Sequence, residues 1–558
     1  MEASRFHRFF GLAGEYQAPF RTGSQSSLVA EILKMLGIRL RWRFIQGILV
    51  AVAISQHAAV FADQRPNVIV ILADDLGYAD VSMYGGKIAT PNIDKLAQSG
   101  VRFTDAHSPS SVCTPTRYGL LTGRYCWRSP LKQGVLGGLS PRLIERDRIT
   151  LAAFLKDRGY STACVGKWHL GMDWELKPGK QVTRLGIEPR DQVFNVHYDR
   201  PITNGPVAVG FDYFFGISAS LDMVPYVTIE NDRVTELPTD DREFLMMDDR
   251  EGGGRTRKGP TAPGFDAADV LPMVTKKSIE VIERHRGGHG QDAKPFFLYV
   301  PLASPHTPIL PTGDWRGQSE INPYADFVMQ TDAAIGEMMA ALRQSGMDEN
   351  TLVIVTSDNG CSPQAKFEEL ARHDHFPSGP LRGHKADLFE GGHRVPMVVH
   401  YPKSKSSGVV SSQVVCLTDI FATVADLIGE QIPDNAAEDS FSFAAEFTGT
   451  AATKPIRDHL VSHSINGSFA IRQGNWKLLL CRDSGGWSDP RPKSPKAADL
   501  PARQLYNLAT DLAERDNRIE DQPAIARELQ ELLRKVVRDG RSTLGEPQKN
   551  WGNVNFGD

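Results

Sequence analysis

The sequence predicts an α/β fold built on a mostly parallel central sheet. Apolar, β-branched runs at residues 67–72 and 352–355 have the composition of strands that are buried on both faces of a sheet. An amphipathic segment at 327–345 carries apolar side chains on one helical face and stops at Gly346. Buried strands that alternate with helices in this way are typical of parallel α/β sheets.

The remaining elements follow the same alternation along the chain. Further core strands are expected at 161–165, 295–300 and 396–400, and further helices at 92–99 and 151–158. The polar, glycine-rich stretch 237–264 has no periodicity, so we expect a long surface excursion that could lie over the site.

The last hundred residues have the pattern of a separate, smaller unit. After a linker-like stretch at 449–455, strand-like runs at 469–472 and 476–480 and a stretch at 505–508 precede a final helix at 523–538. The sequence therefore predicts a catalytic domain over 63–450 and a smaller C-terminal α+β domain over 455–558.

The beginning of the chain has the order of a secretory signal peptide. Arg39, Arg41 and Arg43 precede an apolar run at 44–54, and small residues at 60–62 offer a cleavage site. The apolar run is too short to span a bilayer, so no stable membrane insertion is expected. We interpret residues 1–62 as an N-terminal extension and signal peptide with a true start at Met35, and the mature protein as exported, either periplasmic or secreted.

Composition and cysteine usage narrow the possible functions. The 558 residues are 41% hydrophobic and 23% charged, with a formal net charge of −4 and no basic patch, so a nucleic-acid partner is not expected. Six scattered cysteines are too few for a disulfide framework, although one pair could bridge in an oxidising compartment.

The stretch 111–125 is the most distinctive of the chain. Polar and turn residues at 108–111 can cap a short helix that stops at Gly123. Cys113 would then lie near the helix N-terminus, where free N–H groups and the helix dipole favour an anion. Arg117 follows one turn later and can reach back to Cys113 or to an anion held there. The alternative is a buried, inert cysteine.

Two strand ends offer oxygen ligands for a metal ion. Asp74 and Asp75 follow the strand at 67–72, and Asp358 and Asn359 follow the strand at 352–355. Ligands of parallel sheets collect at the carboxyl ends of strands. Carboxylate and amide oxygens suit calcium or magnesium rather than zinc. Each aspartate alone could instead be a turn or cap residue, but the two pairs together favour a metal site.

Cationic and imidazole side chains follow other predicted strands. Lys167 and His169 follow the strand at 161–165, His306 follows the strand at 295–300, and Lys385 precedes the strand at 396–400. A single such side chain in a loop is usually only solvated. Together with a metal and an anion-ready helix end, these four form a cationic pocket for a tetrahedral oxyanion.

These motifs, in this order, resemble those of the type I sulfatases. The matching motifs are Ala-Asp-Asp, Cys-x-Pro-x-Arg, Gly-Lys-Trp-His-Leu-Gly, Pro-His after a strand, Ser-Asp-Asn-Gly, and Lys followed by Glu-Gly-Gly-x-Arg-x-Pro. They span about residues 66–402, and Leu-Tyr-Asn-Leu near 505 is similar to the family's C-terminal domain. Thr116 departs from the Ser or Ala that is more often found there. The chain looks like a bacterial-type arylsulfatase or carbohydrate sulfatase.

The resemblance implies the fold and the cofactors. It implies an alkaline-phosphatase-like, mostly parallel sheet sandwiched by helices, with a smaller C-terminal α+β domain. It implies that a formylglycine-generating enzyme converts Cys113 to formylglycine. It also implies one calcium ion, whose ligands would be Asp74, Asp75, Asp358, Asn359 and the modified Cys113.

The resemblance also implies a mechanism for sulfate ester hydrolysis through a covalent sulfo-enzyme intermediate. One hydroxyl of the hydrated aldehyde would attack sulfur, and the other would later expel sulfate. Arg117, Lys167 and Lys385 would hold the hydrate and the sulfate. By analogy, His306 would protonate the leaving oxygen and His169 would take the proton in the elimination step.

The substrate is expected to be a sulfated small molecule or oligosaccharide. We expect its sulfated unit to be galactose or N-acetylgalactosamine. The segment 211–222 falls where related enzymes build a wall of the substrate pocket, and Asp222 could meet a sugar hydroxyl. Two alternatives stay open: a phosphonate monoester or phosphodiester hydrolase with the same nucleophile, and a non-catalytic carbohydrate-binding relative.

Overall fold

The computed structural model describes residues 65–248, 254–286, 294–403, 407–449 and 454–556, which belong to one compact unit. The predicted signal peptide and the start at Met35 lie outside these described residues. Within the described part of the chain, no helix combines the length and the apolar character needed to cross a membrane.

The large sheet is mostly parallel, as predicted. β1 (Asn67–Ala73) lies between β11 (Thr351–Ser357) and β10 (Phe296–Pro301) and runs parallel to both. β4 (Ser161–Lys167) and β5 (Tyr213–Ile217) continue the parallel arrangement beyond β10. Every side chain of β1, β10 and β11 is buried, which explains why their sequences are continuous apolar runs without alternation.

The sheet is antiparallel toward both edges. β12 (Met397–His400), the last of the predicted core strands, pairs antiparallel with β11 and with β2 (Val101–Phe103). β13 (Val409–Ser411) pairs parallel with β2 and completes that edge. β6 (Ile229–Glu230) and β7 (Arg233–Val234) form an antiparallel extension of β5. The ten strands found among the described residues follow the order β13-β2-β12-β11-β1-β10-β4-β5-β6-β7.

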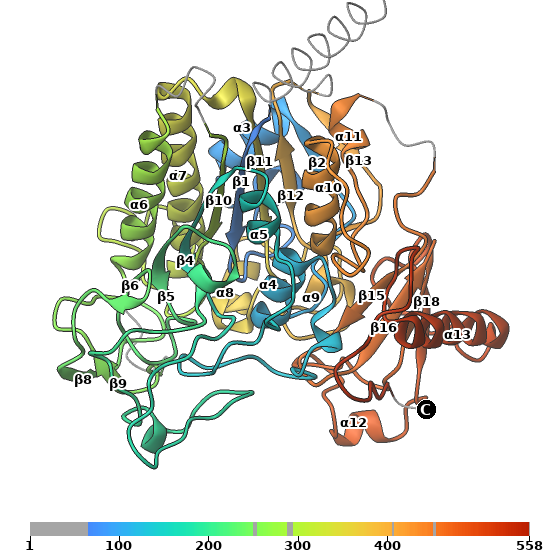
Figure 1. The fold of residues 1–558 in the computed structure, drawn as a ribbon. Helices are drawn as coiled ribbons and strands as arrows, with labels where there is room; N and C mark the ends of the chain where they lie inside the picture. Colours follow the sequence, from blue (N-terminus) through green and yellow to red (C-terminus); the bar gives the residue numbers. More distant parts are fainter. Residues whose placement is uncertain (1–64, 249–253, 287–293, 404–406, 450–453, 557–558) are drawn as a thin grey trace, which may run out of the picture. The chain divides into compact units, whose positions relative to one another are not determined.

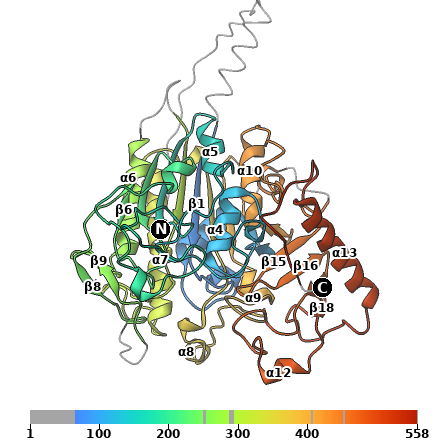
Figure 2. The ribbon, with the colours of Figure 1, turned by 60° about the horizontal axis from the view of Figure 1, so that its bottom comes forward.

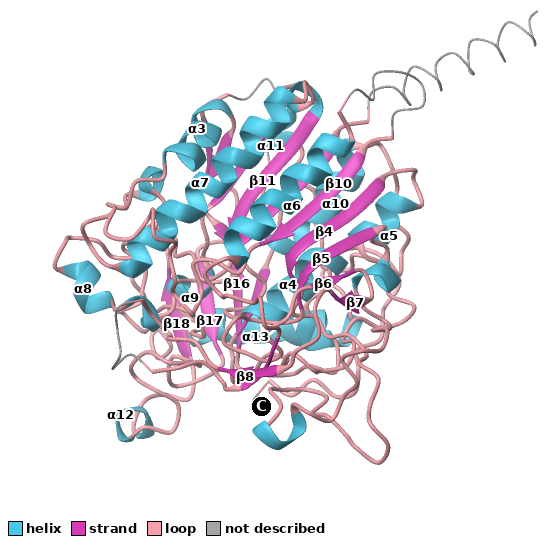
Figure 3. Cartoon of the chain, turned by 90° about the vertical axis from the view of Figure 1, so that its left-hand side faces the viewer, coloured by secondary structure: helices cyan, strands magenta, loops and turns pink. Residues whose placement is uncertain are grey.

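Helices cover both faces of this sheet. On one side, α3 (Pro91–Ser99), α6 (Val270–Arg284) and α7 (Pro323–Gln344) pack against one another, and Figure 3 shows α6 and α7 lying along the parallel strands. On the other side lie α4 (Cys113–Thr122), α5 (Leu151–Lys156) and α10 (Ile420–Leu427) (Figure 1). The helices α6 and α10 were not predicted from the sequence, whereas α3, α5 and α7 were.

A second, antiparallel sheet forms near the C-terminus. β15 (Leu460–His463), β16 (Phe469–Gln473), β17 (Trp476–Leu479) and β18 (Gln504–Asn507) pair in chain order, and α13 (Pro523–Asp539) packs on β16 and β17. This confirms the predicted smaller α+β unit. Its apolar core also takes in Tyr125 and Trp127 from the segment after α4, so the two sheets are joined through the stretch that carries Cys113.

The excursion at 237–264 contains a short hairpin of β8 (Asp240–Arg242) and β9 (Gly259–Thr261). Figure 2 shows this hairpin and the C-terminal sheet on opposite sides of α4. The remaining elements are short: β3 (Ala106–His107), β14 (Val415–Cys416), α8 (Phe367–Ala371), α9 (Glu390–His393), α11 (Ala445–Thr448), α12 (Pro495–Ala498), and the 3₁₀ turns Ser82–Tyr84, Cys126–Arg128, Arg190–Gln192, Pro206–Val209, Asp348–Asn350, Pro363–Ala365 and Leu417–Asp419.

Candidate active site

The metal-ligand candidates meet at the carboxyl ends of two neighbouring strands. β1 and β11 are parallel and in register, with Ala73 opposite Ser357, so Asp74 and Asp75 emerge beside Asp358. All three carboxylates are at most 1% exposed. Each contributes an oxygen to a group whose atoms lie within 4.8 Å of one another. The tertiary structure therefore assembles the three carboxylates that the sequence placed at separate strand ends.

The donor set of this cluster fits a hard cation. The side-chain amide of Asn359 donates to Asp75 Oδ1 at 2.7 Å and to the Gly360 carbonyl at 3.0 Å, which leaves Asn359 Oδ1 as an acceptor. Asn359 Oδ1 and Asp74 Oδ1 are both buried and make no hydrogen bond with the described residues. Buried acceptors without a donor are costly. A cation with a preference for oxygen would satisfy both atoms.

Cys113 is the first residue of α4 and is 3% exposed. Its Sγ lies 3.8 Å from Lys385 Nζ, and it is grouped with Asp74 and His306 as a further set of potential ligand atoms. Burial raises the pKa of the thiol to about 11, although the charges of Lys167 and Lys385 oppose the shift. An unmodified Cys113 would therefore be a neutral thiol near pH 7, and a poor nucleophile.

The start of α4 differs from the prediction in one respect. The serines at 108–111 do not cap the helix, because the N-cap residue is Val112 and it makes no side-chain capping bond. Instead, Ser110 Oγ donates to the His463 carbonyl at 2.8 Å, and the Ser111 amide donates to the same carbonyl at 3.0 Å. Thr116 Oγ1 donates back to the Ser110 carbonyl at 3.0 Å. These polar groups anchor the helix start to the C-terminal sheet.

Arg117 connects three elements beneath the site. Its Nη2 and Nε donate to Asp358 Oδ2 at 2.8 and 3.2 Å, and its Nη1 donates to the Lys167 carbonyl at 3.0 Å. Nη2 also lies 3.4 Å from Asp74 Oδ2. The carboxylates, rather than Cys113, are thus the partners of Arg117 among the described residues. A buried guanidinium with two carboxylates keeps its charge, and its pKa is raised further despite burial.

Lys167 and His306 share one hydroxyl. Lys167 is the last residue of β4, and its Nζ donates to Asp74 Oδ2 at 2.5 Å and to Ser220 Oγ at 3.0 Å. Ser220 Oγ lies 3.2 Å from His306 Nδ1, which contacts the Thr307 carbonyl at 2.6 Å. That contact requires a proton on Nδ1, because a carbonyl can only accept. The other ring nitrogen, Nε2, lies 3.7 Å from Asp75 Oδ2.

His169 and Lys385 complete the predicted set. His169 has a left-handed backbone (φ 55°), and its Nε2 donates to the Leu136 carbonyl at 2.8 Å. Its Nδ1 is buried and makes no hydrogen bond with the described residues. Burial, Lys167 and Arg117 hold the pKa of His169 well below its usual value, so the ring is neutral. Lys385 Nζ lies 2.6 Å from Asp75 Oδ1 and 2.9 Å from Asp75 Oδ2.

The carboxylates differ in their affinity for protons. Burial raises the pKa of Asp74, but Lys167, His306, Arg117 and Lys385 together outweigh that effect and hold the pKa below its usual range. For Asp358, burial and the negative charge of Asp74 raise the pKa to about 7, against the opposing charge of Arg117. Closely spaced carboxylates separate in this way, because one charge disfavours another nearby. An added cation would relieve this repulsion.

Sequence reasoning did not identify Ser220 as a site residue. It lies in the segment that we expected to form a wall of the substrate pocket. In that segment we predicted Asp222 as the functional residue, because a carboxylate can bind a sugar hydroxyl. Asp222 itself pairs with Arg257 of the excursion, with Nη1 3.3 Å from Oδ2. The same excursion meets the segment after His306, where the Asp248 amide donates to the Ile309 carbonyl at 3.0 Å. The excursion therefore lies beside the site.

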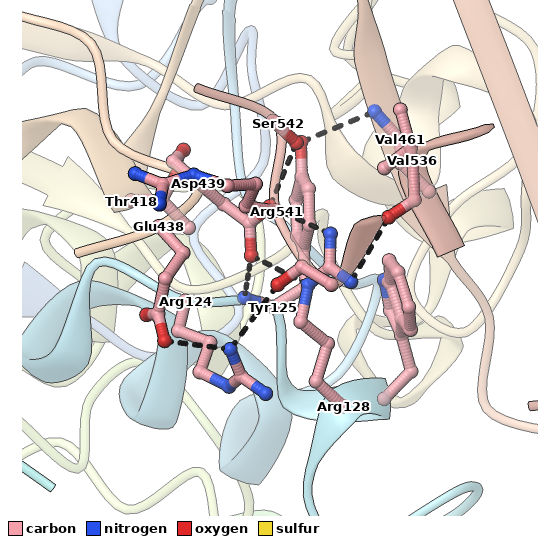
Figure 4. A network of polar contacts seen from close by, with 12 residues as sticks. Arg124, Tyr125, Arg128, Thr418, Glu438, Asp439, Val461, Val536, Arg541 and Ser542 are labelled. Carbon is pink, nitrogen blue, oxygen red and sulfur yellow. Dashed lines mark hydrogen bonds and ion pairs between the residues drawn. The ribbon is translucent and has the colours of Figure 1, made fainter. Parts of the chain in front are cut away.

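The far end of α4 is held by buried ion pairs (Figure 4). Arg124 Nη1 lies 2.8 Å from Glu438 Oε1, and Arg128 makes a two-point contact with Asp439 at 2.8 and 2.9 Å. All four side chains are at most 1% exposed. Together with the anchored N-terminus, these pairs hold both ends of the helix, so Cys113 sits on a rigid element.

Comparison with known proteins places this chain in a family. The Sulfatase family model matches residues 66–430. An N-acetylgalactosamine-6-O-sulfatase from Bacteroides thetaiotaomicron is 33% identical over 512 residues, covering 85% of this chain and 93% of that protein. Arylsulfatase A of Homo sapiens is 30% identical, covering 88% of this chain and 92% of that protein.

Solved structures show the same fold. A structure described under the metabolism of multiple glycosaminoglycans by Bacteroides thetaiotaomicron has a TM-score of 0.71 at 32% sequence identity, covering 85% of this chain and 99% of that chain. A phosphonate monoester hydrolase of Agrobacterium radiobacter has a TM-score of 0.54 at 20% identity, which indicates a shared fold alone. By its family model, its relatives and its fold, the chain belongs to the type I sulfatase family and is a sulfuric ester hydrolase.

Proposed function

We propose that this sulfatase removes sulfate from a sulfated carbohydrate, with N-acetylgalactosamine or galactose sulfate as the reacting unit. The observation that carries the proposal is the convergence of Cys113 with Lys385, Lys167 and the carboxylate cluster in one buried site. The choice of sugar is supported by the N-acetylgalactosamine-6-O-sulfatase that is 33% identical to this chain.

Cys113 is proposed to act as formylglycine, installed by a formylglycine-generating enzyme. The supporting observations are its place in Cys-x-Pro-x-Arg at a helix start and the raised thiol pKa, which makes the unmodified side chain a poor nucleophile. When present, the hydrated aldehyde would supply one hydroxyl to attack sulfur and a second whose deprotonation releases sulfate.

One calcium ion is proposed as the metal, with Asp74, Asp75, Asp358, Asn359 and the modified Cys113 as its ligands. The two orphaned buried acceptors, Asp74 Oδ1 and Asn359 Oδ1, support this ligand set. When bound, calcium would polarise the attacking hydroxyl and offset negative charge on the sulfate.

The chain's own cations and imidazoles have distinct proposed roles. Lys167 and Lys385 bind sulfate oxygens, and Arg117 fixes Asp358 and the nucleophile's helix relative to the metal ligands. The Nδ1–H of His306 donates a hydrogen bond to the Thr307 carbonyl. When Nε2 also carries a proton, it can pass that proton to the leaving oxygen. His169, neutral because of burial and its cationic neighbours, can accept the proton in the release step.

We also propose that the protein is exported and that its chain divides into two regions. The supporting pattern for a periplasmic or secreted protein is the basic, apolar and small-residue order within residues 1–62. The catalytic region would run over 63–450 and the smaller C-terminal region over 455–558.

The test uses Cys113→Ser with Cys126→Ser as the matched control, since Cys126 is also buried but lies outside the site. Protein from a host with the converting enzyme is assayed on sulfated galactose and N-acetylgalactosamine, an aryl sulfate and an aryl phosphodiester. We expect Cys113→Ser to bind sulfate esters without multiple turnover and Cys126→Ser to keep turnover. Continued turnover by Cys113→Ser contradicts the nucleophile assignment, and a faster phosphodiester reaction favours the phosphohydrolase alternative.

Mass spectrometry of the peptide around Cys113 separates the remaining possibility. Formylglycine at this position is expected in active protein. A fully unmodified cysteine in protein from the native host, together with no turnover, would favour a carbohydrate-binding relative without catalysis.

A further inference from the structure

A large groove lies near the C-terminal end of α4, where Arg124 and Arg128 follow the helix. It encloses about 1190 Å³ and is lined mainly by residues of the stretches 139–148, 172–176, 182–185 and 547–552, together with Arg124 and Arg128. We call it the arginine groove. Small-molecule pockets occupy roughly 300–1,000 Å³, so this groove has room for an extended ligand. It lies outside the carboxylate and Cys113 cluster, and the mechanism does not use it.

Ion pairs and hydrogen bonds fix the backbone of one side of the groove. Arg124 and Arg128, already neutralised by Glu438 and Asp439 (Figure 4), also hold the chain's last stretch in place. Arg124 Nη2 donates to the Lys549 carbonyl at 2.6 Å, and the Trp551 amide donates to the Arg128 carbonyl at 2.7 Å. The buried pairs therefore fix the backbone that carries Lys549 and Trp551.

Positive charge exceeds negative charge along the lining. It has seven Arg and Lys residues and three Asp and Glu residues. Three of the cations, Arg124, Arg128 and Arg148, are paired with Glu438 or Asp439, which lie outside the lining. Four of the lining cations make no ion pair with the described residues; these are Arg142, Arg146, Arg184 and Lys549. The four unpaired cations outnumber the three acidic side chains of the lining, on a protein whose formal net charge is −4.

Two of these cations repel each other. Burial and then the charge of Arg146 lower the pKa of Arg142, against the smaller opposing effects of Asp173 and Glu145. Among the residues that the structure describes, the Arg142 guanidinium donates to two backbone carbonyls, of Ile144 at 2.6 Å and of Glu145 at 2.9 Å. An anion between two such guanidinium groups would relieve their repulsion and receive charge-assisted hydrogen bonds.

Apolar surface is exposed in the same groove. Trp551 is 60% exposed, and Leu176 and Leu185 are 43% and 49% exposed. An exposed tryptophan presents a flat apolar face with a polar edge. The apolar face of a sugar ring can pack on such a surface while its anionic groups reach the cations. A ligand with alternating apolar faces and negative groups matches this lining.

Two segments of the groove wall also carry residues near the active site. The Leu143 amide donates to the Leu170 carbonyl at 3.0 Å, and the Met172 amide donates to the Ser140 carbonyl at 3.0 Å. The two segments paired by these bonds therefore lead directly to His169 and to its partner carbonyl at Leu136.

We propose that the arginine groove binds an anionic polysaccharide, the sulfated and carboxylated chain from which the reacting sugar unit is presented. The inference rests on the proposed function for the identity of the ligand. A nucleic acid shares the negative charge, but the sulfate chemistry of the neighbouring site favours the glycan.

The test compares full-length protein carrying Arg146→Ala, Arg184→Ala and Lys549→Ala with wild type. Binding to a chondroitin sulfate polymer is measured by titration calorimetry at several salt concentrations, so turnover is not required. We expect at least a tenfold weaker affinity and a shallower salt dependence in the triple variant, because fewer cations contact the chain. Trp551→Ala is expected to weaken binding without changing the salt dependence.

The matched control removes the same charge elsewhere, through Lys87→Ala, Lys276→Ala and Arg527→Ala, all exposed and outside the groove. It should bind the polymer like wild type. Equal affinity of wild type and the groove triple variant overturns the proposal, as does an equal loss in the control. Equally tight binding of a DNA duplex overturns the glycan assignment. Absence of sulfatase activity with groove-dependent binding would contradict the proposed function alone.

Discussion

Removing the proposed calcium ion should lower the thermal stability of this protein, because two buried oxygen atoms would lose the partner that satisfies them. Asp74 Oδ1 and Asn359 Oδ1 are buried without a hydrogen-bond donor among the described residues. An unsatisfied buried polar group costs about 1–3 kcal/mol, so a cation that satisfies both should contribute about 2–6 kcal/mol. Calcium at a concentration of 100 times its Kd stabilises by about 2.7 kcal/mol, which lies within that range.

The expected shift in Tm follows from chain size. One kcal/mol moves the Tm of a 150–250-residue domain by roughly 2–4 °C, and the described unit is about twice that length, so about 1–2 °C is expected here. A chelator should therefore lower Tm by about 3–5 °C, and calcium should restore it. Differential scanning calorimetry at constant ionic strength measures both steps, and magnesium in place of calcium tests the choice of ion.

The variants Asn359→Leu and Asn350→Leu make the assay specific. Both asparagines have a buried, orphaned side-chain oxygen, but only Asn359 adjoins the carboxylate cluster, where it donates to Asp75. Asn359→Leu should lose most of the calcium response, whereas Asn350→Leu should keep it. An unchanged Tm in wild type upon chelation and calcium addition would refute the reasoning, as would an equal calcium response in both variants.

Three further predictions concern single side chains. Ser220→Ala removes hydrogen bonds to a lysine and a histidine of the site. A loss equal to one charged hydrogen bond, about 1.5–3 kcal/mol, should lower kcat/KM about 10- to 150-fold, while Ser218→Ala stays within about twofold. Arg128→Met leaves the buried Asp439 without its cation and should cost about 3–5 kcal/mol in urea unfolding; a loss below about 1 kcal/mol would contradict this. Burial and Lys132 lower the pKa of His463 to about 4, so the unfolded state binds the proton of this histidine more tightly than the folded state does. The free energy of unfolding of wild type should therefore fall by up to about 3 kcal/mol as pH falls from about 6.5 to 4. His463→Gln should remove this part of the pH dependence.

Local sequence patterns were sufficient for the elements whose burial is uniform. β1 and β11 have every side chain buried, and their continuous β-branched runs predicted β1 to within one residue and the central four residues of β11. The edge strands β6 and β7 have two residues each and no comparable run. Such short pairings are stabilised by neighbouring strands, so no local pattern indicates them.

The same difference explains β4 and α4. The sequence predicted that a strand ends before Gly166, but β4 continues through Lys167 because β5 pairs with it up to Ile217. It also predicted a helix beginning near Cys113, which is confirmed, but with serine caps that the structure does not contain. Ser110 and Ser111 bond instead to the His463 carbonyl, which lies 353 residues from Ser110 along the chain. A local capping rule cannot anticipate such a distant acceptor.

The sequence by itself determined the chemistry available to this protein: a cysteine at a helix start, oxygen ligands after two strands, and cations and imidazoles after others. Only the tertiary structure decided which groups meet. The register of β1 with β11 brings Asp74 beside Asp358, and Arg117 turns to these carboxylates because burial makes unpaired charges costly. The tertiary structure also places the Ser220 hydroxyl between Lys167 and His306, where it makes hydrogen bonds to both side chains. A strand's end is encoded locally, whereas the partners of a buried polar group depend on every element packed around it.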